Sequence, residues 1–588
     1  MIMLGCRIFL VVAIVWSSIF ADEISKKIGD FALLDQNGKH HQLGRYSERD
    51  AAVFLSIGEQ CSKSLEILDR YKLLRTAVLG SNVVFFAIDS TSRGKGVDAS
   101  SRYGTVDSDL PILIDDSRLI TENLGMHRAG DLVIVEPASG EILYNGTIEA
   151  YEGRGIGASD FSSWDSAVSI GEIPSDIRSK EVDQKSALLG GHTESCEPFL
   201  RGEQINRELP DYATEVAPIL KEKCVHCHSR GGIASFAMDS HEVIKGWSSM
   251  IKEVLLTRRM PPMQVDPSVK HFTNASYIEP SEMRVLIRWI DGGALFNNNL
   301  DDPLKRVLPN ATHWQLGEPD HIIQLPAFRV PATGVLDYEN VTMDLPFAKN
   351  VWIKSVHYIP GDKRVLHHLM SYIAPKDSHQ PDVASQESGA WKFLEGYAPG
   401  KDGPVTYPYQ TGVFIPAGST LEVSLHYTTF GKEVVDQTSI ALYFADEEPR
   451  FEYSTYALSN GGSSISIPPG VEEYKMSASH TFEDEIILHG LRPHMHYRGK
   501  YMRMSVEYLD GTVEDIINVP NYNFAWQPTY RLSEPMLLPS GSRVIVYGAF
   551  DNSRHNLGNP DPDAWVRGGA QSWDEMFIGY FSYHRTGK

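Results

Sequence analysis

The sequence predicts a multidomain protein in which an α/β domain comes first, a mostly helical domain second and two all-β sandwich domains last. The chain has 588 residues, whereas single hydrophobic cores stop growing at about 250 to 300 residues. Hydrophobic residues make up 42% and charged residues 22%, which is an ordinary globular balance. The hydrophobic pattern changes twice along the chain, and these changes separate the predicted fold classes.

The chain is strongly acidic, with a formal net charge of −22. A nucleic-acid backbone would be repelled by this charge, and no basic stripe offsets it. We therefore exclude DNA and RNA as partners.

Residues 1–21 predict an export signal. Arg7 gives a positive start, residues 8–16 form a short apolar run, and residues 17–21 supply small residues before Asp22. An uncleaved anchor is the alternative, but the run is short for a bilayer, and no later segment predicts a stable membrane span. We expect a secreted protein, located in a bacterial periplasm.

Residues 22–150 alternate between strands and helices. The expected strands are the apolar runs 52–57, 83–88, 112–114 and 132–135, with a helix over 62–78. This segment resembles the thioredoxin-like redoxins and peroxiredoxins through VFLSIGEQCSKS and LVIVEPASGEILYNG.

Cys61 lies where the first strand turns into that helix, a position that stabilises a thiolate. The second cysteine of a CxxC pair is Ser64 here, and Gly130 stands where such folds carry a cis-proline. A dithiol cycle is therefore not expected. Two interpretations remain, a structural domain in which Cys61 is free or bridged to Cys196, and a thiol peroxidase centred on Cys61.

Residues 151–205 have little periodicity and predict a linker, and residues 206–300 predict the helical domain. Its last helix is marked by apolar residues at i, i+3, i+4 and i+7, followed by a pair of glycines that can end it. These residues are Met283, Leu286, Ile287, Ile290, Gly292 and Gly293.

Cys224, Cys227 and His228 form a CxxCH motif, the attachment sequence of a covalent haem c. The two thiols add to the haem vinyl groups, and the histidine reaches the iron from one face. A disulfide or part of a zinc site is the alternative, although no second cysteine pair exists to complete a zinc tetrahedron. The motif predicts an electron-transfer haem.

The second axial ligand is expected to be Met260, with Met263 as the alternative. Both lie in RRMPPMQVDP, which resembles bacterial c-type cytochrome domains that carry an RMPP motif, an Asp-Pro loop and a helix ending in Trp-x-x-x-Gly. A methionine opposite a histidine raises the haem potential, which suits electron transfer.

Beyond residue 314 the chain changes to short alternating segments broken by Gly and Pro, which predict β-sandwiches. Expected strands include 413–415, 421–427, 486–488 and 543–546. This region also holds His367, His368, His426, His494 and His496. Residues two apart on a strand share a face, so the last two can bind one metal with Met495 turned away.

The stretches VLHHLMSY, LEVSLHYTTFGK, RPHMHYRGK and DEMFIGYFSY together resemble the copper type II, ascorbate-dependent monooxygenases, which hydroxylate peptidylglycine or dopamine. The resemblance implies two jelly-roll-type β-sandwich domains, residues 314–450 and 451–588, facing each other across a water-filled cleft. It assigns His367, His368 and His426 to an electron-entry copper. It assigns His494, His496 and Met576 to an oxygen-activating, catalytic copper.

The same resemblance matches Arg492 and Tyr580 to positions that hold a substrate carboxylate. Arginine suits an anionic substrate, although an ordinary surface ion pair is the alternative for it. Two further pocket positions depart from the family, because Ile578 stands where it has Asn and Ser424 where it has Gln. A peptide substrate is therefore not expected.

The implied activity is hydroxylation of a C–H bond of a small organic substrate by O2, using two copper ions. An external reductant or redox protein would supply electrons, and the haem would relay them to the copper of the first three histidines. Two other functions stay open from the sequence, a non-catalytic copper and haem electron-transfer module and a thiol peroxidase at Cys61.

Overall fold

The computed structural model describes residues 27–58, 64–77, 82–91, 109–148, 209–232, 234–262, 264–275, 277–296, 301–306, 314–376, 391–398, 403–460 and 464–587. Several sequence predictions lie outside these residues. They are the export signal, the linker over 151–205, and the interpretations that depend on Cys61, Cys196 or Met263.

The N-terminal domain is a seven-stranded sheet of order β2-β1-β5-β4-β3-β6-β7. Strands β3, β4 and β5 are parallel, β6 and β7 are antiparallel, and α1 follows β3, so the domain has a thioredoxin-like fold. The predicted strands and helix are confirmed. The elements are β1 (Ala32–Asp35), β2 (His40–Gln42), η1 (Leu43–Tyr46), β3 (Ala51–Ile57), α1 (Ser64–Ala77), β4 (Val83–Asp89), β5 (Ile112–Ile114), α3 (Leu119–Leu124), β6 (Asp131–Val135) and β7 (Ile142–Thr147).

The sheet is covered on both faces. Alternate residues of β3 enter two different cores, with Val53 and Leu55 in one and Ala52 and Phe54 in the other. A strand buried on both faces carries a continuous apolar run, which explains why this segment was recognisable in the sequence.

Helices are the regular elements described for residues 209–306, and they pack around one core. The predicted last helix is confirmed as α8, whose Leu286 and Ile287 are buried and which ends at Gly292. Glu279 and Glu282 form a capping box at its start. The elements are η3 (Tyr212–Val216), α6 (Ala217–Lys223), α7 (His241–Leu256), α8 (Pro280–Asp291) and η4 (Pro303–Arg306).

The first β-sandwich packs the sheet β10-β16-β12-β13 against the sheet β19-β15-β11-β18-β8 around a shared core. Strand β14 pairs with β11, and β9 pairs with β17. The strands are β8 (His321–Gln324), β9 (Phe328–Val330), β10 (Glu339–Asp344), β11 (Val351–Ile359), β12 (Leu366–Ala374), β13 (Lys392–Tyr397), β14 (Val405–Thr406), β15 (Thr411–Ile415), β16 (Thr420–Tyr427), β17 (Val434–Asp436), β18 (Ser439–Phe444) and β19 (Phe451–Glu452).

The second β-sandwich packs the sheet β20-β29-β23-β26 against the sheet β22-β27-β24-β25. Strands β21 and β28 pair with each other. The strands are β20 (Ser454–Ser459), β21 (Ser466–Ile467), β22 (Tyr474–Thr481), β23 (Ile486–His494), β24 (Gly499–Glu507), β25 (Val513–Val519), β26 (Tyr530–Leu538), β27 (Arg543–Phe550), β28 (Val566–Arg567) and β29 (Ile578–Arg585).

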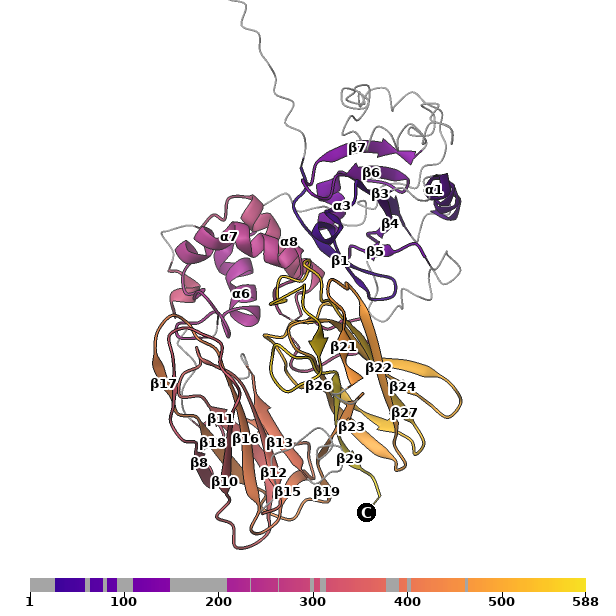
Figure 1. Ribbon diagram of the computed structural model, residues 1–588. Helices are drawn as coiled ribbons and strands as arrows, with labels where there is room; N and C mark the ends of the chain where they lie inside the picture. Colours follow the sequence, from indigo (N-terminus) through magenta and orange to yellow (C-terminus); the bar gives the residue numbers. More distant parts are fainter. Residues whose placement is uncertain are drawn as a thin grey trace, which may run out of the picture.

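The two sandwiches lie side by side, and the N-terminal and helical domains sit together at one end of them (Figure 1). Arg288 of α8 contacts Glu122 of the N-terminal domain at 3.4 Å, and Arg45 contacts Asp551 of the second sandwich at 2.8 Å. None of the described helices combines the length and the apolar character that crossing a membrane requires.

Candidate metal and haem sites

The first histidine set is built on two neighbouring strands. His368 on β12 and His426 on β16 are cross-strand partners, with ring centroids 5.9 Å apart. Adjacent residues on a regular strand point to opposite faces, but the register of β12 shifts between Leu366 and His368. This irregularity brings the rings of His367 and His368 to within 4.1 Å, centroid to centroid. The three histidines are therefore neighbours in space, with His368 next to both of the others.

Two nitrogens of this set, Nε2 of His368 and Nδ1 of His426, are buried and have no hydrogen-bond partner among the described residues. We call these two atoms the open nitrogens. Burial lowers the pKa of His367 to about 4 and the pKa of His368 and His426 well below the usual range for histidine. The imidazoles are thus neutral at pH 7, and neutral imidazole is the metal-binding form.

The second histidine set lies at the end of β23. The rings of His494 and His496 are 5.2 Å apart, and Met495 between them is buried in the sandwich core, as expected. The expectation that both histidines lie on a strand is wrong, because β23 ends at His494. The backbone leaves the β-ladder because both polar groups of Met495 bind the hydroxyl of Tyr522. This hydroxyl accepts a hydrogen bond from the N–H of Met495 and donates one to its carbonyl.

Each histidine of this second set is oriented by a hydrogen bond from its Nδ1 atom. Nδ1 of His494 lies 2.5 Å from Oε1 of Gln527, and Nδ1 of His496 lies 3.1 Å from the carbonyl oxygen of Asp574. Burial lowers the pKa of His496 to about 4 and the pKa of His494 well below its usual range. Nε2 of each ring is then the atom that can bind a metal.

Met576 is held near the second set by the buried carboxylate of Glu575. That carboxylate accepts hydrogen bonds from the backbone N–H groups of His496 at 2.8 Å and Arg498 at 2.7 Å. His494 pairs with Ile578 in the β23–β29 ladder. Met576 therefore lies two residues before β29, at the end of the ladder where His494 lies.

Phe524 lies between the two histidine sets. Its ring centroid is 5.6 Å from His367, 5.8 Å from His368 and 5.7 Å from His496. Tyr338 stacks on His426 at 3.4 Å, and its hydroxyl lies 2.8 Å from Oγ of Ser572, close to Met576 in the chain. Side chains from both sandwiches therefore join the two sets.

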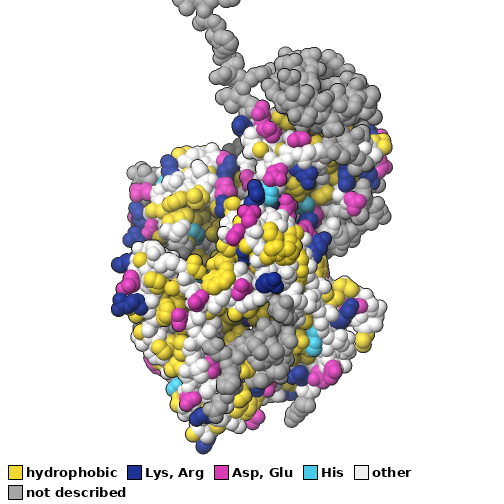
Figure 2. All heavy atoms as spheres, viewed as in Figure 1, with side chains coloured by type: hydrophobic (Ala, Val, Ile, Leu, Met, Phe, Trp, Pro, Cys, Tyr) yellow, Lys and Arg dark blue, Asp and Glu magenta, His cyan; other side chains and the backbone are white. Residues whose placement is uncertain are grey.

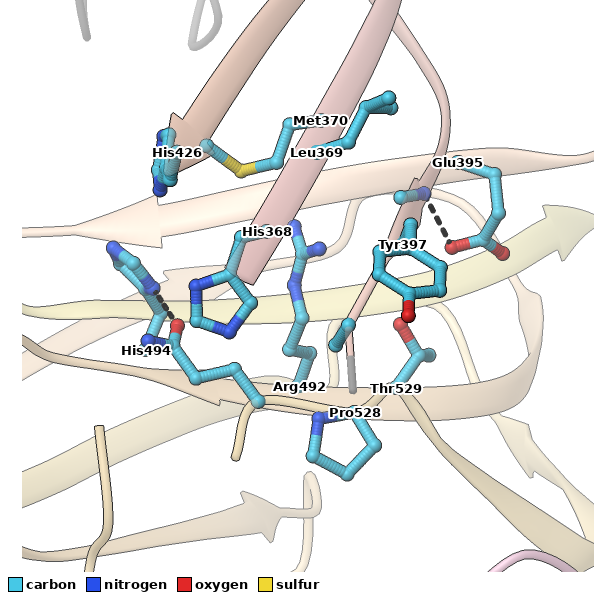
Figure 3. Close-up of a pocket in the computed structure, with 13 residues that line it drawn as sticks. His368, Leu369, Met370, Glu395, Tyr397, His426, Arg492, His494, Pro528 and Thr529 are labelled. Carbon is cyan, nitrogen blue, oxygen red and sulfur yellow. Dashed lines mark hydrogen bonds between the residues drawn. The ribbon is translucent and has the colours of Figure 1, made fainter. Parts of the chain in front are cut away.

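His368, His426 and His494 line one small cavity, with Arg492 between them and Tyr397 (Figure 3). Its volume is about 30 Å³, so it is a small cavity. The sulfur end of Met370 extends toward His426 in the same view. Residues of both sandwiches thus line it.

Arg492 and Tyr580, the predicted substrate-binding pair, are in contact. The guanidinium carbon of Arg492 lies 4.0 Å from the ring centre of Tyr580 and 4.6 Å from that of Phe393 in the first sandwich. Arg492 is 7% exposed, and its Nε and Nη2 atoms have no hydrogen-bond partner in the part of the chain that the structure describes. Aromatic faces hold this cation, while two donors stay available for an anion.

The donor types fit copper, since neutral imidazole binds it in both oxidation states and a thioether prefers Cu(I). Within the described ranges, however, no three His, Cys, Asp or Glu side chains converge closely enough to hold a metal ion. The histidines therefore meet copper's chemical requirement, while binding needs small side-chain movements.

The CxxCH segment follows α6 and closes one helical turn, with the N–H of His228 donating to the carbonyl of Cys224 at 3.0 Å. Nδ1 of His228 lies 3.0 Å from the carbonyl oxygen of Phe236. Because a carbonyl oxygen only accepts, Nδ1 carries the ring proton and donates this hydrogen bond. Nε2 is then unprotonated and can bind iron. The arrangement fits a haem attached at Cys224 and Cys227.

An apolar surface lies beside His228. Phe236 is 4.7 Å from the His228 ring and stacks on Trp247 at 4.8 Å, and Trp247 is 39% exposed. Met260, the predicted second ligand, is also 39% exposed. Phe236 and Trp247 thus form a partly exposed aromatic surface beside His228, which a haem face would cover.

Several residues of these sites escaped the sequence analysis. They are Tyr338, Phe524, Gln527 and Glu575, which contact the predicted ligands from distant parts of the chain. No spacing rule identifies them, because each reaches its histidine through tertiary packing.

No protein-family model matches the chain, and no curated protein matches it. Among solved structures, the chain is similar to an exposed lipoprotein thioredoxin from Streptococcus pneumoniae, with 22% identity over 20% of this chain and 89% of that one, at a TM-score of 0.18. It is similar to a peroxidoxin from Mycobacterium tuberculosis, with 14% identity over 24% and 94% and a TM-score of 0.19. It is also similar to a thioredoxin-like protein from Aeropyrum pernix, with 15% identity over 23% and 86% and a TM-score of 0.17.

Proposed function

We propose that this protein is a copper-dependent monooxygenase that hydroxylates a C–H bond of a small organic substrate, with a c-type haem as its electron relay. The observation that carries the proposal is the meeting of five histidines from two β-sandwiches, four of them buried, with Phe524 in contact with His367, His368 and His496. Burial keeps them neutral, and the open nitrogens have lone pairs to offer.

The reaction converts a C–H bond, O2, two electrons and two protons into an alcohol and water. When bound, copper would supply the one-electron chemistry that activation of dioxygen requires. His367, His368 and His426 would hold the electron-entry ion. His494, His496 and Met576 would hold the catalytic ion, and the thioether of Met576 favours the reduced state.

Other residues of the chain would position these ligands and the substrate. Gln527 and the carbonyl of Asp574 fix the rings of the second set, and Glu575 ties the Met576 segment to His496. Arg492 would receive an anionic group of the substrate, since two of its donors are buried without a partner among the described residues.

A second candidate is a non-catalytic copper and haem electron-transfer module. One observation favours it: the cavity of about 30 Å³ is small beside the pockets that usually hold small organic ligands. Turnover by the proposed enzyme would require the sandwiches to separate or side chains of the cavity to move.

Oxygen consumption by the copper-loaded, haem-containing protein tests the proposal. Candidate anionic substrates are screened for hydroxylated products, and Met576→Ala is expected to abolish substrate-dependent consumption while Met476→Ala, a partly buried methionine elsewhere in the same sandwich, retains it. Equal oxygen consumption with and without copper, or in Met576→Ala and Met476→Ala, would leave the electron-transfer module as the function.

The relay is tested separately under anaerobic conditions. The reduced haem is expected to reoxidise faster when Cu(II) is loaded than in the copper-free protein. Equal rates would remove the haem from the proposed electron path without touching the copper sites.

A further inference from the structure

A second cavity, of about 200 Å³, lies where the N-terminal domain meets the second sandwich. Four of its lining side chains are cationic, Lys39, Arg45, Lys500 and Arg503. The other polar lining residues are Asn37, His40, Tyr501, Asn518, Asn521 and Tyr547, and none of the described lining residues is acidic. Figure 2 shows charged and histidine side chains side by side on the surface where this domain meets the sandwiches.

The turn between β1 and β2 closes one wall of this cavity. Gly38 has a φ of +69°, and its carbonyl accepts a hydrogen bond from Nδ2 of Asn518 at 3.0 Å. A Cβ atom at Gly38 would lie 2.5 Å from that nitrogen and 2.7 Å from Oδ2 of Asp266. Arg503 donates to the carbonyl of Asn37. Glycine is therefore required both by the left-handed backbone and by the close approach of the domains.

The two arginines of the cavity have their own counter-charges. Arg45 contacts Asp551 and Arg503 contacts Asp515, each at 2.8 Å. Both pairs are within hydrogen-bonding distance, so these two guanidinium groups are held in place in the cavity wall.

The two lysines of the cavity are less well compensated. Lys39 lies 3.6 Å and Lys500 3.8 Å from the same carboxylate, that of Glu473, which Lys475 also contacts at 3.3 Å. One carboxylate thus serves three ammonium groups. Burial lowers the pKa of Lys500. The carboxylates of Asp551 and Glu473 raise it in part, whereas the positive charges of Arg45 and Lys39 lower it further.

We propose that this cavity binds a small oxyanion with a phosphate or sulfate group. Its polar wall presents ammonium, guanidinium, amide and phenol donors, which are the groups that bind such oxygens. A volume of about 200 Å³ lies below that of pockets for drug-sized ligands, and it suits an inorganic anion or a small ester of one.

The ligand would bind only when the two domains are docked, because each contributes half of the cationic wall. By linkage, it would stabilise that docked arrangement. The site is independent of the copper and haem sites.

The test uses the full-length protein and calorimetric titration with inorganic phosphate, sulfate and succinate at constant ionic strength. We expect saturable binding of phosphate or sulfate with a dissociation constant of about 1 mM or tighter, and weaker binding of succinate. The double variant Lys39→Gln/Lys500→Gln is expected to lose at least about tenfold in affinity. Lys475→Gln, which removes the same charge near Glu473 from outside the cavity, should change affinity by less than about twofold.

Hydrogen exchange gives a second measurement that does not depend on these lysines. Bound anion is expected to slow exchange of backbone amides in residues 36–40 and 500–503, and Gly38→Val should remove both the binding and the slowing. Absence of saturable binding, tighter binding of succinate, or equal affinity in the wild type and the double variant would overturn the proposal.

Discussion

Replacing His426 by phenylalanine should have opposite effects on the copper-free and the copper-loaded protein. His426 is 6% exposed, its Nδ1 is one of the open nitrogens, and its ring stacks on Tyr338 at 3.4 Å. A buried polar atom that lacks a partner costs about 1 to 3 kcal/mol, and phenylalanine removes this cost while keeping the stacked ring.

The variant also loses one weak contact, the 3.4 Å approach of His426 Nε2 to the Ser424 hydroxyl. The net expectation is that copper-free His426→Phe is about 1 to 2 kcal/mol more stable than the wild type. For a cooperatively unfolding domain of about 150 to 250 residues, that difference raises Tm by roughly 2 to 8 °C. That result would show that the imidazole of His426 does not serve the stability of the copper-free protein.

Differential scanning calorimetry with a chelator and with added copper measures both effects. Copper should raise the Tm of the wild type more than that of His426→Phe, because one ligand of the first set is missing in the variant while the second set is intact. His480→Phe is the matched control, since His480 also stacks on a tyrosine, Tyr456, but accepts or donates a 3.1 Å bond to its hydroxyl. His480→Phe should be less stable than the wild type, and copper should raise its Tm by as much as it raises that of the wild type.

Two results would refute this reasoning. One is a copper-free His426→Phe protein that is less stable than the wild type by as much as His480→Phe. The other is an equal rise in Tm with copper in the wild type and His426→Phe.

Three further predictions follow from the same structure. Met576→Ala should retain the copper of the first histidine set, so metal analysis should find about half of the wild-type copper; loss of all copper would contradict two separate sites. Cys224→Ser/Cys227→Ser should lack covalent haem in a pyridine haemochrome assay, whereas Cys61→Ser should keep it. Burial lowers the pKa of His40 to about 3, so the unfolded chain takes up a proton near pH 6.5 and the folded chain does not. Acidification from pH 6.5 to 5 should then lower the free energy of unfolding by up to about 2 kcal/mol. The stability of His40→Gln, measured by calorimetry, should decrease less over the same acidification.

Much of the fold could be predicted from the sequence, because its signals are local. The apolar runs of the N-terminal sheet are buried on both faces, and the i, i+3, i+4 pattern of α8 marks one side of a helix. The CxxCH motif spans a single helical turn, so its chemistry is also contained in neighbouring residues. The exception is His496, which was expected on a strand and lies just beyond one, since Tyr522 from a distant loop ends the ladder at Met495.

By itself the sequence determined the fold classes, the haem attachment motif and the list of candidate metal ligands. Only the tertiary structure decided how these ligands meet, with Phe524 between the two histidine sets and Arg492 held between Tyr580 and Phe393. It also decided that basic groups from two domains enclose one cavity. The physical reason is that periodicity and motifs record contacts between near neighbours in the chain. Contacts between residues a hundred or more positions apart depend instead on strand register and on how the domains pack.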